Sequence, residues 1–223
     1  MKSKWQLHCD TWRDGCGSEY CSAANKIVLG KGKLPCDVLF IGEAPGASED
    51  VLGRPFVGPA GKVLDLIISR VGLNPSACPE CGSECSDTAS GITCKNGHGG
   101  VLSREEFSPG KRLAFTNLVG CIPRGGDHSK ITEPDDEQIM SCRDRLAEFI
   151  KIADPKLIVT CGKHSDLWTD PHLKTSVKFH KPIQRVNIML PAAILRAPVA
   201  AQGLLVQRAE VALAYAMEEA FQG

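Results

Sequence analysis

Two groups of cysteine residues have spacings typical of metal ligands. In the first, Cys78 and Cys81 flank a Pro-Glu dipeptide, and Cys94 precedes His98 by four positions. Two thiolates on a tight turn, with a thiolate and an imidazole from a second segment, complete a tetrahedral structural zinc site. Cys85 is a rival fourth ligand, and the spacing does not choose between it and His98. The sequence therefore predicts zinc here, and the alternative is a disordered loop with free thiols.

The segment that carries this predicted site, residues 75–104, interrupts an otherwise ordinary globular chain. It holds almost no apolar residues and no expected strand or helix of useful length. Because such a segment cannot build its own core, metal binding would supply its folding free energy. We therefore expect one domain over residues 1–223 with a zinc-ribbon-like insert at 75–104.

The second group of cysteines is Cys9, Cys16, Cys21, Cys121 and Cys142. In a reducing compartment, paired thiols bind metal more often than each other. The wide separation of this group along the chain suits a cluster that fastens the N-terminal arm to the fold. The two remaining cysteines, Cys36 and Cys161, adjoin apolar runs, and we interpret them as small buried hydrophobic residues.

Composition limits the classes of protein that the chain can belong to. It has 223 residues, 43% hydrophobic and 23% charged, and 26 basic residues balance 26 acidic ones. These values indicate a globular protein with a core; they exclude a polybasic nucleic-acid-binding surface but not a locally basic cleft. No apolar run reaches about 18 residues, and no apolar segment follows the N-terminal lysines. We expect no membrane span, no secretory signal and a cytoplasmic location.

Short apolar runs that end at turn residues predict the strands that position these groups. They cover residues 38–41, 113–119, 157–160 and 186–190. Because they do not alternate with polar residues, they favour strands buried on both faces, as in a parallel sheet. Segments of helical periodicity cover residues 61–71, 134–152 and 202–221. Strands that alternate with helices predict an α/β fold, in which ligands bind at the carboxyl ends of the strands.

The turns after these strands carry the motifs of a known family. Residues 41–46 read Ile-Gly-Glu-Ala-Pro-Gly, and residues 53–61 read Gly-Arg-Pro-Phe-Val-Gly-Pro-Ala-Gly. This first motif resembles that of the iron–sulfur (family 4) uracil-DNA glycosylases. Residues 116–123, 155–162 and 190–196 resemble the later motifs of the same family. The resemblance covers about residues 16–221 and is interrupted only by the insert.

The resemblance implies a fold and a cofactor. The fold is three-layer α/β/α with a central, mostly parallel four-stranded sheet. The cofactor is a structural 4Fe–4S cluster held by Cys16, Cys21, Cys121 and Cys142, since such a cluster needs four thiolates. Cys16 and Cys21 are further apart than the corresponding pair of the family, so Cys9 is an alternative to either. A zinc site or free thiols are the other interpretations.

The resemblance also implies the activity: a DNA glycosylase that hydrolyses the N-glycosidic bond of uracil or another altered base flipped out of DNA, in base excision repair. Phe56 would stack on the base, Asn117 would read the O4 and N3 edge of a pyrimidine, and Glu43 would orient or activate the water that attacks C1′. An amide both donates and accepts, which separates uracil from cytosine. The backbone amides of Gly42 and Ala44 suit base or phosphate contacts.

Simpler structural roles remain open for these three side chains. Phe56 is also explained by core packing, Asn117 by a buried structural amide, and Glu43 by a carboxylate that caps the following turn. No sequence feature marks an oligomer interface, so we expect a monomer that binds DNA.

One position departs from the family pattern. Leu190 stands where the family has a histidine that donates a hydrogen bond to O2 of the leaving uracil. Loss of one preorganised donor costs about 10²–10³ in rate, and His180 or Asn187 are candidates to replace it. Two alternatives to uracil excision follow: a protein that binds DNA without catalysis, or an enzyme that processes a modified or hypermodified pyrimidine, for which an apolar Leu190 leaves room.

Overall fold

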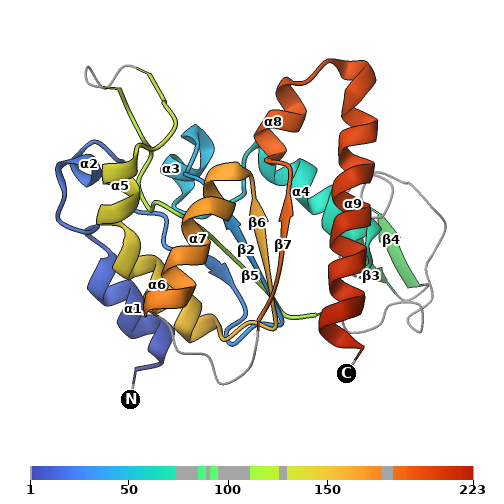
Figure 1. The fold of residues 1–223 in the computed structure, drawn as a ribbon, viewed down its shortest axis with the longest axis horizontal. Helices are drawn as coiled ribbons and strands as arrows, with labels where there is room; N and C mark the ends of the chain where they lie inside the picture. The colour runs from blue at the N-terminus through green and yellow to red at the C-terminus, as the bar shows by residue number, and fades with distance from the viewer. Residues whose placement is uncertain are drawn as a thin grey trace.

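A five-stranded sheet forms the centre of the molecule (Figure 1). The computed structural model describes residues 2–73, 85–88, 91–94, 111–125, 130–176 and 183–222. In spatial order the strands are β1 (Lys31–Gly32), β5 (Leu113–Asn117), β2 (Val38–Gly42), β6 (Leu157–Cys161) and β7 (Gln184–Ile188). The last four run parallel, and β1 pairs antiparallel with β5. The predicted four-stranded parallel sheet is confirmed, and β1 adds a short antiparallel edge.

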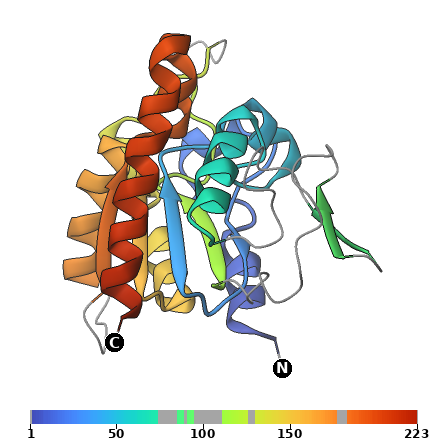
Figure 2. The same cartoon turned by 90° about the vertical axis from the view of Figure 1, so that its right-hand side faces the viewer.

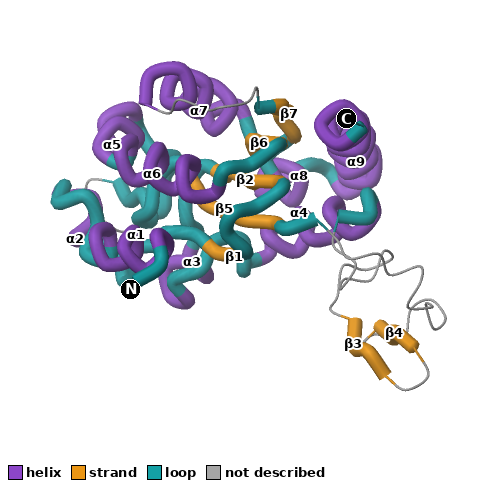
Figure 3. The backbone as a smooth tube through the Cα atoms, turned by 90° about the horizontal axis from the view of Figure 1, so that it is seen from below, coloured by secondary structure: helices purple, strands orange, loops and turns teal. Residues whose placement is uncertain are grey.

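Helices cover both faces of this sheet, which gives the three predicted layers (Figure 3). One layer contains α1 (Lys4–Trp12), α6 (Arg143–Ala153) and α7 (Lys163–Ser176), and the other contains α4 (Pro59–Arg70) and α9 (Val199–Phe221). Four shorter helices lie toward the carboxyl ends of the strands: α2 (Glu19–Ser22), α3 (Ala47–Leu52), α5 (Asp136–Ser141) and α8 (Pro191–Arg196) (Figure 1).

The central strand β2 shows why its sequence is apolar throughout. Val38 and Phe40 pack into the core on the α4 and α9 side, whereas Leu39 and Ile41 pack into the core on the α6 side. All four side chains are completely buried. Burial of each stabilises the fold by about 1.5–3 kcal/mol. Cys36 and Cys161 are also buried, as predicted.

The helix predicted over residues 134–152 is two helices. Asp135 caps α5, since its carboxylate accepts a hydrogen bond from the Gln138 backbone amide at 2.8 Å. The chain then breaks at Cys142, which ends α5 and begins α6. Ile139 and Leu146, one on each side of the break, are buried in the same core. Because both helices bury their apolar residues in the same core, the hydrophobic periodicity continues across Cys142 and does not show the break.

Two parts of the chain contain structure that the sequence did not predict. In the N-terminal arm, α1 begins at the cap residue Ser3, and its buried His8 packs against Trp5 and Phe149. In the insert, β3 (Cys85–Thr88) and β4 (Gly91–Cys94) form an antiparallel hairpin, so the expectation of an insert without strands was wrong. The hairpin stands outside the three layers (Figure 2).

Within the described part of the chain, each helix is too short or too polar to cross a bilayer.

Candidate active site

The carboxyl ends of the parallel strands form the floor of a cavity of about 440 Å³. β2 ends at Gly42 and β5 ends at Asn117, and the sheet register places these two residues side by side. The residues that were expected to meet the base all line the cavity: Gly42, Glu43, Ala44, Phe56, Asn117 and Leu190. They come from four separate segments, which the fold brings together at the carboxyl edge of the sheet.

Gly42 is the point at which two of these side chains meet. A Cβ atom on Gly42 would lie 2.4 Å from Oδ1 of Asn117 and 2.7 Å from Cζ of Phe56. No larger residue fits without displacing the amide or the ring. The amide of Asn117 and the ring of Phe56 therefore converge over the end of β2. A planar ligand needs one group at its edge and one against its face, and these two side chains can provide them.

Phe56 both packs and faces the cavity. Its ring is half-buried and meets Phe115 edge to face, with 6.0 Å between ring centroids. Its backbone has a φ of 51°, in the left-handed region, which non-glycine residues adopt rarely. Nζ of Lys31 donates a hydrogen bond to the Phe56 carbonyl at 3.0 Å and helps to hold this conformation. Core packing and a cavity-facing role are therefore compatible for this ring.

The loop that carries Phe56 is organised by a buried carboxylate. Glu49 accepts hydrogen bonds from the backbone amides of Gly46, Val57 and Gly58, at 3.1, 2.9 and 2.8 Å. Charged acceptors make the stronger kind of hydrogen bond. Glu49 therefore caps α3 and joins the start of α3 to the start of α4.

Asn117 is fixed from behind by a buried cation. Arg145, on α6, is only 2% exposed. Its guanidinium donates to the carbonyls of Asn117 and Leu118, at 2.5 and 2.9 Å. It also reaches the Leu29 carbonyl and the Thr116 hydroxyl. The strand end that presents the Asn117 amide is thus tied to two other segments, α6 and the segment that contains Leu29.

Glu43 lies in the turn after β2, and its carbonyl accepts a hydrogen bond from Val119 at 3.2 Å. Its carboxylate is 11% exposed and lies 3.6 Å from Nδ1 of His164. Burial raises the pKa of Glu43, and the neighbouring His164 opposes this shift. A partly buried carboxylate at the edge of a cavity has the environment of a general base.

The wall opposite Asn117 has no such polar group. Leu190 precedes α8 and makes no side-chain capping hydrogen bond. Of its two candidate replacements, Asn187 is exposed and its Oδ1 accepts from the Thr160 hydroxyl at 3.2 Å, outside the cavity lining. His180 lies outside the described residues. Arg196, on α8, supplies the cation at this side of the cavity.

The second group of cysteines converges at the side of the sheet next to the N-terminal arm. The sulfur of Cys21 lies 3.5 Å from that of Cys16 and 3.9 Å from that of Cys121. The Cys121 thiol lowers the pKa of Cys21 to about 5 and that of Cys142 to about 6 through hydrogen bonds. The group thus combines four thiols from three segments, a donor set suited to iron–sulfur or other soft metal sites.

These sulfur contacts are not arranged around a metal ion. Among the described residues, no group of three or more His, Cys, Asp or Glu side chains has the arrangement of an ion-binding site. The thiols instead touch one another. Cys21 contacts Cys16 and Cys121, and Cys121 interacts with Cys142, so the four thiols lie together.

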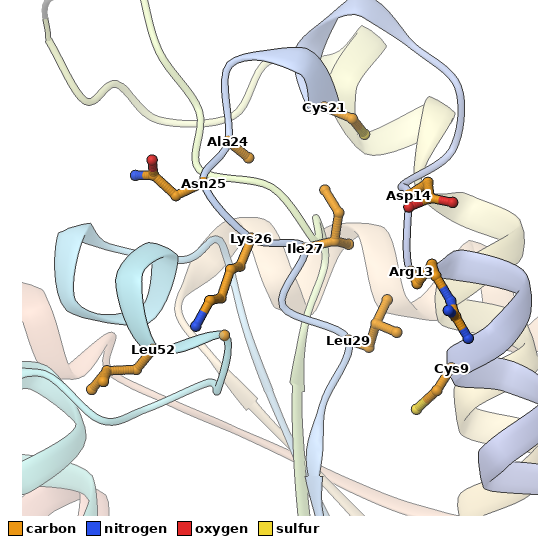
Figure 4. A pocket seen from close by; sticks show the side chains of 11 residues that line it. Cys9, Arg13, Asp14, Cys21, Ala24, Asn25, Lys26, Ile27, Leu29 and Leu52 are labelled. Carbon is orange, nitrogen blue, oxygen red and sulfur yellow. The ribbon is translucent and has the colours of Figure 1, made fainter.

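Cys9 is not part of these contacts. It lines a larger cavity of about 740 Å³ between α1, the loop after α2 and the end of α3. Figure 4 shows Cys9 on α1 at one end of this cavity and Cys21 at the other. The geometry therefore groups Cys21 with Cys16, Cys121 and Cys142 rather than with Cys9.

The predicted zinc ligands lie mostly beyond the described residues. Cys78, Cys81 and His98 are outside them. The backbone register of the β3–β4 hairpin places Cys85 directly opposite Cys94. Facing residues of an antiparallel pair have Cα atoms about 4.5–5.5 Å apart, so Cys85 remains a candidate ligand beside Cys94.

Fold and site together define an α/β protein with a cavity at the carboxyl ends of a parallel sheet. The family model described as the uracil DNA glycosylase superfamily matches residues 29–208. The chain belongs to this superfamily, as the sequence motifs predicted.

Several characterised relatives share one name within the superfamily. The chain is 32% identical over 138 residues to the type-4 uracil-DNA glycosylase of Saccharolobus solfataricus, which covers 62% of this chain and 46% of the relative. It is 45% identical over 136 residues to the type-4 uracil-DNA glycosylase of Thermotoga maritima, and the match covers 61% of this chain and 50% of that relative. It is 25% identical over 185 residues to the type-4 uracil-DNA glycosylase of Archaeoglobus fulgidus, and the match covers 77% of this chain and 73% of that relative. The chain thus spans about half the length of the first two relatives.

Sequence reasoning missed three residues that support the site: His164, Arg145 and Lys31. His164 lies in the first turn of α7, two residues after Gly162 and at the same sheet edge as Gly42. A titratable residue just after a parallel strand was the available signal. Arg145 and Lys31 gave none, since a surface charge and a buried one look alike in a sequence.

Proposed function

We propose that the protein is a DNA glycosylase that hydrolyses the N-glycosidic bond of uracil, or of another altered base, flipped out of DNA. One observation carries this proposal: Glu43, Phe56 and Asn117 converge on a single cavity over Gly42. Membership of the uracil DNA glycosylase superfamily supports it. Base excision repair in the cytoplasm, by a monomer, is the setting we propose.

Each of the three side chains has a defined part in the reaction. The flipped base stacks on Phe56, and the Asn117 amide pairs with its O4 and N3 edge. Glu43 accepts a proton from water as the water oxygen bonds to C1′. The C1′–N1 bond breaks, and its electron pair leaves with the base. Backbone amides at Gly42 and Ala44 contact the base or a neighbouring phosphate.

Leu190 shapes the expected rate. A leucine gives O2 of the leaving base no hydrogen-bond donor, so uracil release is expected to be slower by about 10²–10³ than with a donor in place. The apolar side chain also leaves room for a bulkier substituent on the pyrimidine. This supports a second candidate function, the processing of a modified or hypermodified pyrimidine, and a third in which the protein binds DNA without cleaving it.

The test is base release from single- and double-stranded oligonucleotides that carry uracil, hypoxanthine, xanthine or 5-hydroxymethyluracil. Wild-type release that Glu43→Ala abolishes would establish a glycosylase. Release of a modified pyrimidine but not of uracil would establish the second candidate. Binding to every oligonucleotide without release of any base would establish the third.

Cys16, Cys21, Cys121 and Cys142 are the proposed ligands of a 4Fe–4S cluster. Bound there, the cluster would act as a structural crosslink rather than a redox group. It would join the N-terminal arm to the end of β5 and the junction of α5 and α6. The convergence of the four thiols supports this assignment.

Iron and sulfide analysis of protein purified without oxygen tests the cluster. Cys16→Ala is expected to lose iron, whereas the matched variant Cys9→Ala is expected to keep it. If Cys9→Ala loses iron and Cys16→Ala keeps it, Cys9 rather than Cys16 is the cluster ligand. A colourless wild-type protein without iron or sulfide would contradict the cluster.

The insert is proposed to bind one structural zinc ion through Cys78, Cys81, Cys94 and either His98 or Cys85. The pairing of Cys85 with Cys94 in the hairpin supports a place for Cys85 near the ion. Metal analysis of Cys85→Ser and His98→Ala would identify the fourth ligand, which is the one whose loss lowers the zinc content. Absence of zinc from the wild type would contradict the site.

A further inference from the structure

The carboxylate of Glu43 occupies a space that a neighbouring strand leaves open for it. Gly162 directly follows β6 and has a φ of 107°, which favours glycine. A Cβ atom there would lie 2.6 Å from Oε1 of Glu43 and 3.1 Å from Cβ of Leu190. Gly162 therefore accommodates the Glu43 carboxylate against Leu190. The position of Glu43 depends on the turn after β6 as well as on its own loop.

The start of α7 faces the same carboxylate. The backbone amide of His164 lowers the pKa of the Glu43 carboxyl, and Nδ1 of the imidazole lies 3.6 Å from Oε1. Among the described residues, this nitrogen is buried and has no hydrogen-bond partner. A helix N-terminus favours a negative charge beside it. The amide, the helix and a protonated imidazole all stabilise the ionised form of Glu43.

The other charged and titratable groups around Glu43 come from three further elements. Burial raises the pKa of Glu43; Glu133, in the segment before α5, raises it further, and Arg196, on α8, lowers it. The buried Cys161 thiol of β6 has a raised pKa, to which Glu43 contributes. His164 and Arg196 are thus the groups that lower the pKa of Glu43 against burial and Glu133, and of these two Arg196 is exposed.

We infer that His164 is a positioning residue for Glu43: its ring nitrogen holds the carboxylate toward the cavity and supplies a positive charge beside it. This role rests on the proposed glycosylase function. It places a histidine next to the reacting groups from α7, beside the wall where Leu190 offers no donor. His164 does not line the cavity, so it acts through Glu43 rather than on the base.

The direct test is independent of activity. In the purified protein with its metals, the Glu43 carboxyl is titrated by ¹³C NMR, with its signal assigned by its loss in Glu43→Gln. His164→Ala is expected to raise the pKa of Glu43, because the opposing charge and the contact are removed while burial remains. His164→Gln keeps a polar side chain without charge and is expected to raise it less. Lys163→Ala, which removes the adjacent exposed cation, serves as the matched control.

An unchanged Glu43 titration in His164→Ala would overturn the inference, as would an equal shift in Lys163→Ala. Such a result would leave the proposed glycosylase function untouched. Conversely, a wild type that releases no base would contradict the proposed function, and the titration would still decide the contact between His164 and Glu43.

Kinetics then tests the consequence for catalysis. Glu43 must be ionised to accept a proton, so activity falls as pH drops through its pKa. Raising that pKa in His164→Ala is expected to move the acidic limb of the single-turnover rate to higher pH. The loss is expected to be about tenfold, and larger at acidic than at alkaline pH, as misplacement of a reacting group predicts. A uniform loss at every pH would indicate a merely structural role and would overturn the inference.

Discussion

The floor of the cavity and the wall opposite it are supported in different ways. On the floor, the carbonyl of Asn117 is held by Arg145 and that of Phe56 by Lys31. The wall, at α8, presents Leu190 without a side-chain capping bond. The part that would recognise a base is thus fixed by hydrogen bonds to charged groups. At the part that would meet the leaving group, Leu190 offers no side-chain hydrogen bond, and Arg196 is the nearby cation on α8. Recognition and leaving-group stabilisation therefore have separate structural supports in this molecule.

The largest effect is expected from removing the carboxylate between the two sides. Glu43→Ala should lower the single-turnover rate of base release by about 10²–10⁴, the usual contribution of a general base. Glu133→Ala removes an exposed carboxylate that also lines the cavity, and it is the matched control. Equal losses in the two variants would mean that overall charge matters and that Glu43 has no special position.

Giving the wall a donor should sharpen the contrast. Leu190→His is expected to raise uracil release by about 10²–10³, because a hydrogen bond to O2 becomes available as charge develops. Leu190→Ala widens the cavity without adding a donor and should not reproduce the gain. If both substitutions raise the rate equally, space rather than hydrogen bonding limits the reaction.

Weakening the floor should be visible in stability. Arg145→Met removes the donor to the buried carbonyls of Asn117 and Leu118, whereas the Leu29 carbonyl keeps its hydrogen bond from the Thr116 hydroxyl. The free energy of unfolding, measured with urea, is expected to fall by about 3 kcal/mol. Arg145→Lys keeps part of the bonding and should lose less. A fully stable Arg145→Met would show that the floor does not depend on this cation.

The smallest of these effects concerns the ring. Phe56→Ala should weaken binding to uracil-containing DNA by about 1–3 kcal/mol, the value of stacking one base. Phe56→Tyr keeps the stacking surface and should bind like the wild type. Lower stability with unchanged DNA affinity in Phe56→Ala would instead assign the ring to core packing.

The sequence was most informative about the strands and about the functional motifs that directly follow them. The apolar runs located the four parallel strands, and the motif around Gly42 located the cavity. The break at Cys142 was hidden because both helices bury the same face. His164 was missed because its contact with Glu43 depends on which strand lies next to β2, and only the folded sheet sets this order.

The N-terminal arm and the hairpin were hidden for a different reason. The residues of α1 have no strong apolar periodicity, and its packing depends on the distant α6, where Phe149 meets Trp5 and His8. The β3–β4 hairpin is made of short polar strands. Neither carries the pattern from which buried strands and helices are predicted.

Arg145 lies three residues after Cys142, on the first turn of α6, and its charge acts on that thiol. The same side chain grips the carbonyl of Asn117. Oxidation of the cysteines around Cys142 would therefore be expected to shift Arg145, and with it the Asn117 amide that is proposed to bind the edge of the base. Oxidation of the cysteine group is therefore expected to change which base the protein accepts, because Arg145 connects that group to Asn117.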